Sequence, residues 1–460
     1  MNVRKFFISA FLLPIVVNAQ TSIFNDGEST TGALRNMAHN ASTGVEAAIY
    51  NPAGLSFASG QFAVSVNGIA NYQQVLCSNY PWDNTDGAFN RKQNAQLFGI
   101  SPSVQAFAKI KKTTISLSYA NEGGTRWSDP DGDVVLNHYL ETNPEIQSSL
   151  ALTNLLLAAS GYLANEDDYL FFSTKDFVSQ SYNRCVRLGA SYDFGNGLSA
   201  YLGLRYNHIN VNTKSDLGMY MFIPSRNEKM LFADYNEKVA NQSLDIDNSI
   251  NEIDSLLQNS FNYPSINTRS ISPVIGLAYN YKTLNMGAKY EMSPSVILNT
   301  DGLYYPHSFS LGVSNLFWNR MLLSLGADVK CGYKGNGAIL FNAEKQPVVY
   351  QIAMGIDFSV VPDRFNISAS VAGGNTVISN TVVNVTKDYI TSTMNNWKAS
   401  FGVQCKIVNN LVADCGVMMN LRTINDLENV INGGTPIGSF LYQFGYRYAA
   451  GVGLTYVFSE

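Results

Sequence analysis

Arg187 and Arg205 are placed where they could bind an anionic group. They lie in two segments, 184–194 and 198–212, and each segment alternates apolar with small or polar residues. A period of two is typical of a β-strand. Only residues 195–197, with the sequence Gly-Asn-Gly, separate the two segments, which predicts a hairpin. The chemistry expected here is the recognition of a charged group by two neighbouring strands.

The predicted turn fixes which residues of this hairpin face each other. With a three-residue loop, Phe194 opposes Leu198, and Arg187 lies directly opposite Arg205. Like charges in that position repel each other, so we expect an anion between them. A carboxylate there would accept charge-assisted hydrogen bonds from the guanidinium groups. Lys289, on a later predicted strand at a similar height, is expected to join them.

The sequence does not arrange residues as catalysis or metal binding would require. Its four histidines are His39, His138, His208 and His307. None has serine and aspartate companions at the same predicted height, which a nucleophilic site needs. We also find no cysteine and histidine spacing that would hold a metal and no glycine-rich phosphate loop. We therefore expect no enzyme activity, no metal site and no cofactor.

Strand periodicity recurs along nearly the whole chain. An even number of antiparallel strands is typical of a bacterial transmembrane β-barrel, and fourteen segments of this chain show the pattern. They are residues 61–73, 97–109, 113–121, 183–194, 198–212, 270–281, 285–293, 305–315, 319–331, 347–359, 364–375, 397–407, 411–422 and 440–458.

The connections between these segments alternate between short and long. Short periplasmic turns and long outer loops are typical of outer-membrane barrels, so both chain ends are expected in the periplasm. A β-sandwich also alternates along its strands, but its loops do not alternate in length. The predicted fold is an all-β, 14-stranded antiparallel transmembrane β-barrel. The short connections are residues 110–112, 195–197, 282–284, 316–318, 360–363 and 408–410.

Composition agrees with a wall that faces lipid. Charged residues make up 14% of the chain, below the roughly 25% of soluble domains. A net charge of −5 gives no support for a nucleic-acid partner. Residues 1–19 carry Arg4 and Lys5 before an apolar run, which predicts a cleaved signal peptide. Cys405 and Cys415 share one predicted face of a hairpin, either as two lipid-facing residues or as a bonded pair.

If the aromatic faces of the strands meet lipid, the other faces point inward. A lipid-facing Arg or Lys near the midplane costs about 2–4 kcal/mol, so the charged residues of the strands are expected inside. They are Lys109, Arg187, Arg205, Lys289, Glu291, Arg320, Asp328, Lys330, Asp357, Lys398, Lys406, Asp414 and Arg447.

Two long loops contain apolar stretches typical of helices, at residues 145–164 and 244–257. These helices would either cover the barrel mouth or form a groove for an apolar ligand. The groove candidates are Leu150, Leu155, Leu156, Ile250 and Ile253.

The segment before the first strand differs from the rest in composition. It is rich in Ala, Gly and small polar residues, and Asn51, Pro52 and Ala53 lie near its end. Such a segment can fold inside a wide barrel as a plug. The sequence therefore divides into a signal peptide at 1–19, an N-terminal plug at 20–60 and a barrel at 61–460.

This arrangement resembles the FadL/TodX family of outer-membrane transporters for long-chain fatty acids and other hydrophobic compounds. Asn51, Pro52 and Ala53 match the Asn-Pro-Ala plug motif of that family. The resemblance implies passive, plug-gated diffusion: a ligand enters an outer groove, binds in the lumen by its carboxylate and leaves sideways. The family's exit lies at a kinked third strand, here residues 113–121, which Gly123-Gly124 follows.

The resemblance leaves alternatives open for the site and for the function. The anion between Arg187 and Arg205 is either a plug carboxylate, such as Glu28 or Glu46, or the head group of a fatty acid. The rival functions are a general porin and an adhesin or structural outer-membrane barrel. The expected partners are a long-chain fatty acid or other hydrophobic small molecule and outer-membrane lipid. We expect a monomer that binds no nucleic acid.

Overall fold

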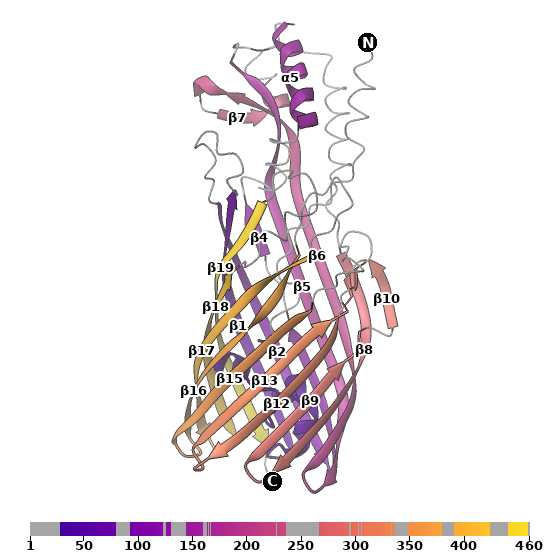
Figure 1. Ribbon diagram of the computed structural model, residues 1–460, viewed down its shortest axis with the longest axis vertical. Helices are drawn as coiled ribbons and strands as arrows, with labels where there is room; N and C mark the ends of the chain where they lie inside the picture. Colours follow the sequence, from indigo (N-terminus) through magenta and orange to yellow (C-terminus); the bar gives the residue numbers. More distant parts are fainter. Residues whose placement is uncertain are drawn as a thin grey trace.

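A computed structural model shows a long barrel with an arm at its upper end (Figure 1). The chain leaves the last strand at the lower rim, where Val457 N donates a hydrogen bond to the carbonyl oxygen of Asn410 in a short turn. The structure describes residues 28–79, 93–122, 126–129, 144–159, 163, 165, 167–226, 228–235, 266–293, 296–301, 303–304, 306–332, 334–335, 348–379, 391–423 and 440–458.

Within these residues, fourteen antiparallel strands form a closed ring. Strands β1 and β19 close it, from the pair Phe62↔Phe458 to the pair Asn79↔Phe440. The predicted 14-stranded barrel is therefore confirmed. The strands are β1 (Phe62–Asn79), β2 (Gln93–Ile110), β3 (Thr113–Asn121), β5 (Tyr169–Gly195), β6 (Leu198–Ile223), β8 (Ile266–Tyr281), β9 (Leu284–Glu291), β12 (His307–Phe317), β13 (Met321–Cys331), β15 (Val349–Val361), β16 (Phe365–Ser379), β17 (Thr391–Val408), β18 (Leu411–Thr423) and β19 (Phe440–Phe458).

Several strands extend further toward the long loops than the sequence predicts. Strand β5 begins at Tyr169 and not at 183, and β6 continues to Ile223 and not only to 212. Neighbouring residues of the added part, such as Leu170 and Phe171, are both apolar. Because both faces carry apolar side chains there, the period of two that marks the lower part of the wall is absent.

The β5–β6 hairpin pairs Arg187 with Arg205, as predicted, but through a different turn. Gly195, and not Phe194, pairs with Leu198, so the loop is one residue shorter than expected. A register shift at Phe194 compensates for this difference. Such a β-bulge inserts one residue without changing the pairing beyond it, and the two arginines therefore stay opposite each other.

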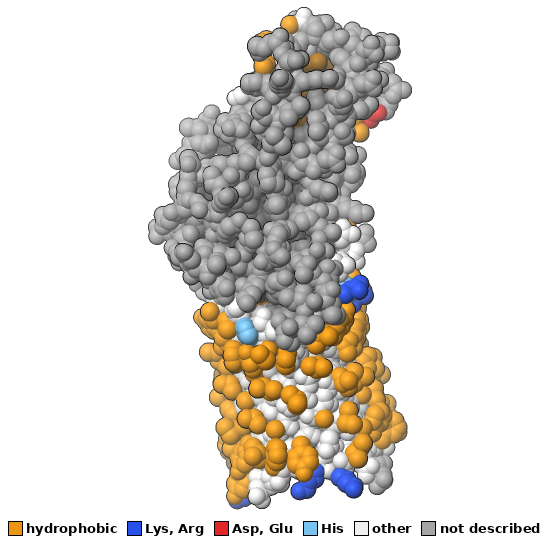
Figure 2. Space-filling view, turned by 90° about the vertical axis from the view of Figure 1, so that its right-hand side faces the viewer, with side chains coloured by type: hydrophobic (Ala, Val, Ile, Leu, Met, Phe, Trp, Pro, Cys, Tyr) orange, Lys and Arg blue, Asp and Glu red, His pale blue; other side chains and the backbone are white. Residues whose placement is uncertain are grey.

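The outer face of the barrel is an apolar belt. Leu188, Leu202 and Val452 are 55%, 69% and 66% exposed, and Figure 2 shows many hydrophobic side chains on one face of the lower part of the barrel. The inward faces of the same strands carry small polar residues such as Ser199 and Ser270, which are buried. A contiguous apolar band of this kind is typical of barrels that stand in a membrane.

Arg320 does not lie inside the barrel, contrary to the prediction. Strand β13 begins at Met321, so Arg320 belongs to the short turn before it and is exposed. A residue at the rim reaches water directly, and the cost of placing its charge in lipid does not apply to it.

Residues 28–58 lie inside the barrel. They form α2 (Thr31–Arg35), α3 (Ala47–Tyr50) and η1 (Pro52–Phe57), and most of their side chains are buried. The wall approaches this segment closely. A Cβ atom added to Gly355 would lie 2.0 Å from Asn36 Oδ1, so any other residue there would have to displace the Asn36 side chain.

The arm consists of the upper parts of β5 and β6 with β7 (Glu228–Leu231) and α5 (Pro144–Ala159) (Figure 1). Asn154 of α5 donates to the carbonyl oxygen of Leu170 at 2.9 Å and accepts from its N–H at 2.6 Å. The remaining elements are β4 (Arg126–Asp129), η2 (Pro224–Arg226), α6 (Phe232–Tyr235), β10 (Val296–Asp301), β11 (Leu303–Tyr304) and β14 (Lys334–Gly335).

Two predicted segments lie outside the described residues: the signal peptide at 1–19 and the apolar stretch at 244–257. No helix in the described ranges is long and apolar enough to cross a membrane.

Candidate functional site

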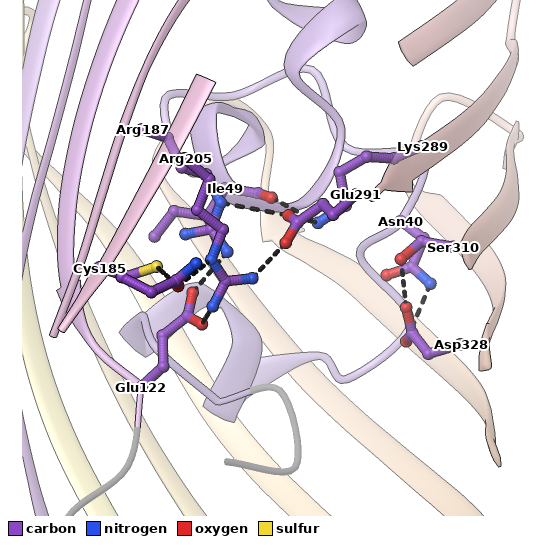
Figure 3. A network of polar contacts seen from close by, with 11 residues as sticks. Asn40, Ile49, Glu122, Cys185, Arg187, Arg205, Lys289, Glu291, Ser310 and Asp328 are labelled. Carbon is purple, nitrogen blue, oxygen red and sulfur yellow. Dashed lines mark hydrogen bonds and ion pairs between the residues drawn. The ribbon is translucent and has the colours of Figure 1, made fainter. Parts of the chain in front are cut away.

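Two arginines and two glutamates form a closed ring of ion pairs on the inner wall (Figure 3). Arg187 Nη2 lies 2.6 Å from Glu122 Oε1, and Arg187 Nε lies 3.2 Å from Glu291 Oε1. Arg205 pairs with the second oxygen of each of the same two carboxylates. Each carboxylate therefore bridges both guanidinium groups, which removes the repulsion between Arg187 and Arg205.

The ring is almost completely removed from water. Arg205 is fully buried, and the side chains of Glu291 and Arg187 are 1% and 4% exposed. Asn207 Oδ1 accepts a hydrogen bond of 2.6 Å from Arg205 Nε and one of 3.2 Å from Cys185 Sγ. These contacts fix the direction of the Arg205 guanidinium and therefore the position of the ring.

Lys289 connects the ring to the segment inside the barrel. Its Nζ donates to Glu291 Oε1 at 2.9 Å and to the carbonyl oxygen of Ile49 in α3 at 2.8 Å. The three predicted residues Arg187, Arg205 and Lys289 thus lie together. With Glu122 and Glu291 they hold three positive charges against two negative ones, which gives these five residues a net charge of +1.

The wall supplies the two carboxylates of the ring, whereas the sequence suggested Glu28 or Glu46 from the N-terminal segment. Glu28 instead lies 2.6 Å from Lys398 Nζ and 3.5 Å from Arg447 Nη1. Glu46 lines a separate cavity with Arg35 and Asp414, and burial raises the pKa of its carboxyl group.

Sequence reasoning placed Glu291 on the inner face but missed Glu122. Glu122 follows the last residue of β3, so no strand pattern assigns its side chain to a face. The backbone N–H of Glu122 donates to the carbonyl oxygen of Asn183 on β5, which holds it beside Arg187. The repulsion between two opposed arginines was the available signal that a second wall carboxylate was needed.

Further contacts hold the inner segment to other strands. Arg35 Nη1 lies 2.8 Å from Asp357 Oδ1 on β15, and Asn36 Nδ2 donates to Asp357 Oδ2 at 2.6 Å. Asn40 Nδ2 donates to Asp328 Oδ2 on β13 at 3.1 Å (Figure 3). On the other side Lys109 Nζ donates to the carbonyl oxygen of Ser56 at 3.1 Å. The segment is therefore attached around much of the wall.

The residues of the Asn-Pro-Ala motif connect α3 to η1. Asn51 Nδ2 donates to the carbonyl oxygen of Ser42 at 3.0 Å, and Pro52 begins η1. The carbonyl oxygen of Ala53 accepts a hydrogen bond of 2.7 Å from Ser199 Oγ on β6. All three residues are buried, and they fix the end of the inner segment against the wall.

A pocket lies between the ion-pair ring and the inner segment. Arg187, Lys289 and Glu291 are among its lining residues. His39 and Tyr50 line it from the inner segment, with their ring centroids 3.6 Å apart. Arg187 Nη1 is buried and has no hydrogen-bond partner in the described part of the chain. The pocket therefore offers a positively charged donor to an anionic group.

The loop-groove candidates are only partly described. Leu150 of α5 is buried and Leu155 is 66% exposed, so they do not share one apolar surface. The Leu156 side chain, Ile250 and Ile253 lie outside the described residues.

The strand register of the wall differs between β3 and β4. The pairing of β3 with β2 includes Ala120↔Ser103, and that of β4 with β2 is Arg126↔Phe98. Between these two pairs the β3–β4 side contains one residue more than β2. The offset has the size of a β-bulge, and Glu122 of the ring lies at its beginning.

Solved structures of transporters resemble this chain over most of its length. The P. putida toluene transporter TodX matches with 13% identity over 90% of this chain and 94% of its own, at a TM-score of 0.53. A Pseudomonas aeruginosa FadL homologue matches with 12% identity over 93% and 98%, also at 0.53. The Ralstonia pickettii toluene transporter TbuX matches with 12% identity over 90% and 94%, at 0.51.

The chain has the FadL/TodX fold. No protein-family model matches the sequence, and no curated protein matches it by sequence. The solved structures confirm, for the fold, the resemblance that the Asn-Pro-Ala motif indicated. In this FadL-like barrel the ion-pair ring, the pocket and the register offset after β3 lie next to one another.

Replacing Glu291 by glutamine should destabilise the barrel by about 3–5 kcal/mol, because it leaves buried positive charges with one carboxylate fewer. The measurement is the urea concentration at which the folded, heat-modifiable band disappears on gels. Asp363→Asn, in an exposed short turn, is the control. Equal midpoints for the two variants would contradict the importance of the ring.

Acidification should loosen the inner segment through His39. Burial lowers the pKa of His39 to about 4 from 6.5, so the imidazole is neutral while the inner segment is bound to the wall. Binding of the segment to the wall is unaffected above pH 6.5. It weakens as the pH falls from 6.5 toward 4, because in that range the imidazole takes up a proton only when the segment is released. Limited proteolysis of the segment at pH 7.5 and pH 5 measures the effect. The variant His39→Gln should show no such difference, and a difference of the same size in that variant would exclude His39 as its source.

Proposed function

We propose that this protein is an outer-membrane channel for the uptake of hydrophobic compounds by passive diffusion. The observation that carries the proposal is a membrane-type barrel whose bore holds residues 28–58. A general porin needs an open, water-filled lumen, and the ion-paired inner segment opposes one. The toluene transporters TodX and TbuX have the same fold.

The apolar belt supports a location in the outer membrane. A bacterial barrel of this type has its short turns in the periplasm and its long loops outside. In that orientation both chain ends are periplasmic, and the arm of β5 and β6 projects from the cell. The inner segment then acts as the plug, and its movement gates the passage.

Hydrophobic cargo favours a sideways exit over release into water. The transfer of each CH₂ group from an apolar environment into water costs about 0.8 kcal/mol of free energy. The register offset between β3 and β4 is the place we assign to the exit. Glu122 at this point belongs to the ring that lines the pocket, so the binding site and the exit are adjacent.

We further propose that the cargo includes long-chain fatty acids. The unpartnered Arg187 Nη1 favours an anionic head group in the pocket. Lys289 lies beside it and also holds the plug through Ile49. A carboxylate that draws on Lys289 would weaken that contact, which links ligand binding to movement of the plug.

Expression in a Gram-negative host should raise the uptake of radiolabelled fatty acid or toluene several-fold over a strain with an empty vector. Proteoliposomes with the purified protein should not swell in small sugars, because the plug leaves no wide water path. Swelling as rapid as that of a general porin, without a gain in hydrophobic uptake, would contradict the proposal and favour the porin alternative.

The variant Arg187→Gln should bind a long-chain fatty acid about tenfold more weakly, because a charge-assisted hydrogen bond is worth about 1.5–3 kcal/mol. Binding of the fatty alcohol of equal length should not change. Displacement of a fluorescent fatty acid from the detergent-solubilised protein measures both affinities, with Arg364→Gln in an exposed turn as the control. An unchanged ratio of acid to alcohol affinity would assign Arg187 a structural role only.

A further inference from the structure

A row of basic side chains crosses three strands on the outside of the barrel. In the strand register, Arg184 of β5 lies opposite His208 of β6, and His208 lies opposite Arg269 of β8. The neighbours Cys185, Asn207 and Thr268 are buried on the inner face, so the alternation of the strands directs the three basic side chains outward. Arg184 and Arg269 are exposed.

The basic row lies at the upper limit of the apolar belt. Below it on the same outer face come Leu188, Leu204 and Ile275, each at least half exposed. Residues 184–194 of β5, at about 3.3 Å per residue and a tilt of about 40°, span a height of about 25 Å. This equals the apolar band of outer-membrane barrels. Figure 2 shows basic side chains just above the hydrophobic belt.

The side chains of the row are held in place but not neutralised. The Arg184 guanidinium lies over the Tyr182 ring, 4.2 Å from its centroid, and the same ring meets His208 edge-on at 5.2 Å. His208 Nε2 is 3.0 Å from Asn267 Oδ1. Within the described part of the chain, neither Arg184 nor Arg269 forms an ion pair. The two guanidinium groups are therefore available to an external anion.

We propose that the row Arg184, His208 and Arg269 binds phosphate groups of lipids in the outer leaflet of the membrane. Neighbouring strands lie about 4.8 Å apart, so the two arginines are about 10 Å apart at the backbone and their long side chains can converge on one phosphate. Guanidinium groups bind phosphate through paired, charge-assisted hydrogen bonds. The height of the row at the belt's edge favours a phosphate fixed in a lipid layer. The choice of leaflet rests on the orientation given under the proposed function.

The lipid would act on the same part of the wall as the proposed exit. Arg184 pairs with Asn121, the last residue of β3, and Glu122 follows it in the chain. A phosphorylated lipid on the row would therefore occupy the outer surface beside the register offset after β3. Bound lipid there would stabilise β3, β5, β6 and β8 against one another at the point where the pairing is offset.

The test is native mass spectrometry of the detergent-solubilised protein titrated with diphosphoryl lipid A and with chemically dephosphorylated lipid A. The double variant Arg184→Gln and Arg269→Gln should bind the diphosphoryl form at least tenfold more weakly and the dephosphorylated form unchanged. The control Arg320→Gln and Arg364→Gln removes two exposed arginines at the opposite end of the barrel and should behave as the wild type.

Three results would overturn the proposal. They are equal binding of diphosphoryl lipid A by the double variant and the wild type, an equal loss for both lipid forms, or competition by inorganic phosphate at low millimolar concentration. The last result would point to free phosphate and not to lipid. Fatty-acid displacement in the double variant should match the wild type, so failure of this proposal is separable from failure of the channel function.

Discussion

Closure of the sheet by β1 and β19 is the constraint on which the rest of the structure depends. Because the wall has no open edge within the membrane belt, its backbone groups pair from strand to strand, as hydrocarbon requires. Closure also separates the side chains into two unlike sets. Apolar residues such as Leu202 and Val452 are exposed outside, and small or charged residues face a bore that the N-terminal segment occupies.

The charged residues inside the barrel join the wall to that segment. Leaving one of a buried set of charges without its partner is costly, and the structure avoids this by sharing carboxylates. Glu291 contacts both arginines of the ring and also Lys289, which reaches the backbone of Ile49. The same groups line the pocket. The groups that anchor the segment are therefore the same groups that would contact an anionic ligand.

On the outside of the barrel, the charged side chains that the structure describes lie at the edge of the apolar belt and not within it. In the belt itself the strands show apolar side chains to their surroundings, and the basic row begins where this belt ends. Arg184 is held by an aromatic ring and not by a carboxylate. A guanidinium placed in this way remains available to an anion at the membrane surface, whereas the guanidinium of Arg205 inside the bore is enclosed.

The sequence by itself determined the number of strands, the alternation of their two faces and the opposition of Arg187 and Arg205, because these follow from a period of two and from short turns between neighbouring strands. It also identified the N-terminal segment by composition and the Asn-Pro-Ala motif. It did not determine the upper ends of β5 and β6. Only the tertiary structure decided which carboxylates meet the arginines. Glu122 and Glu291 are far apart in the chain. Only the pairing of the strands into a closed barrel, with the register offset after β3, brings both to the same height on the inner wall.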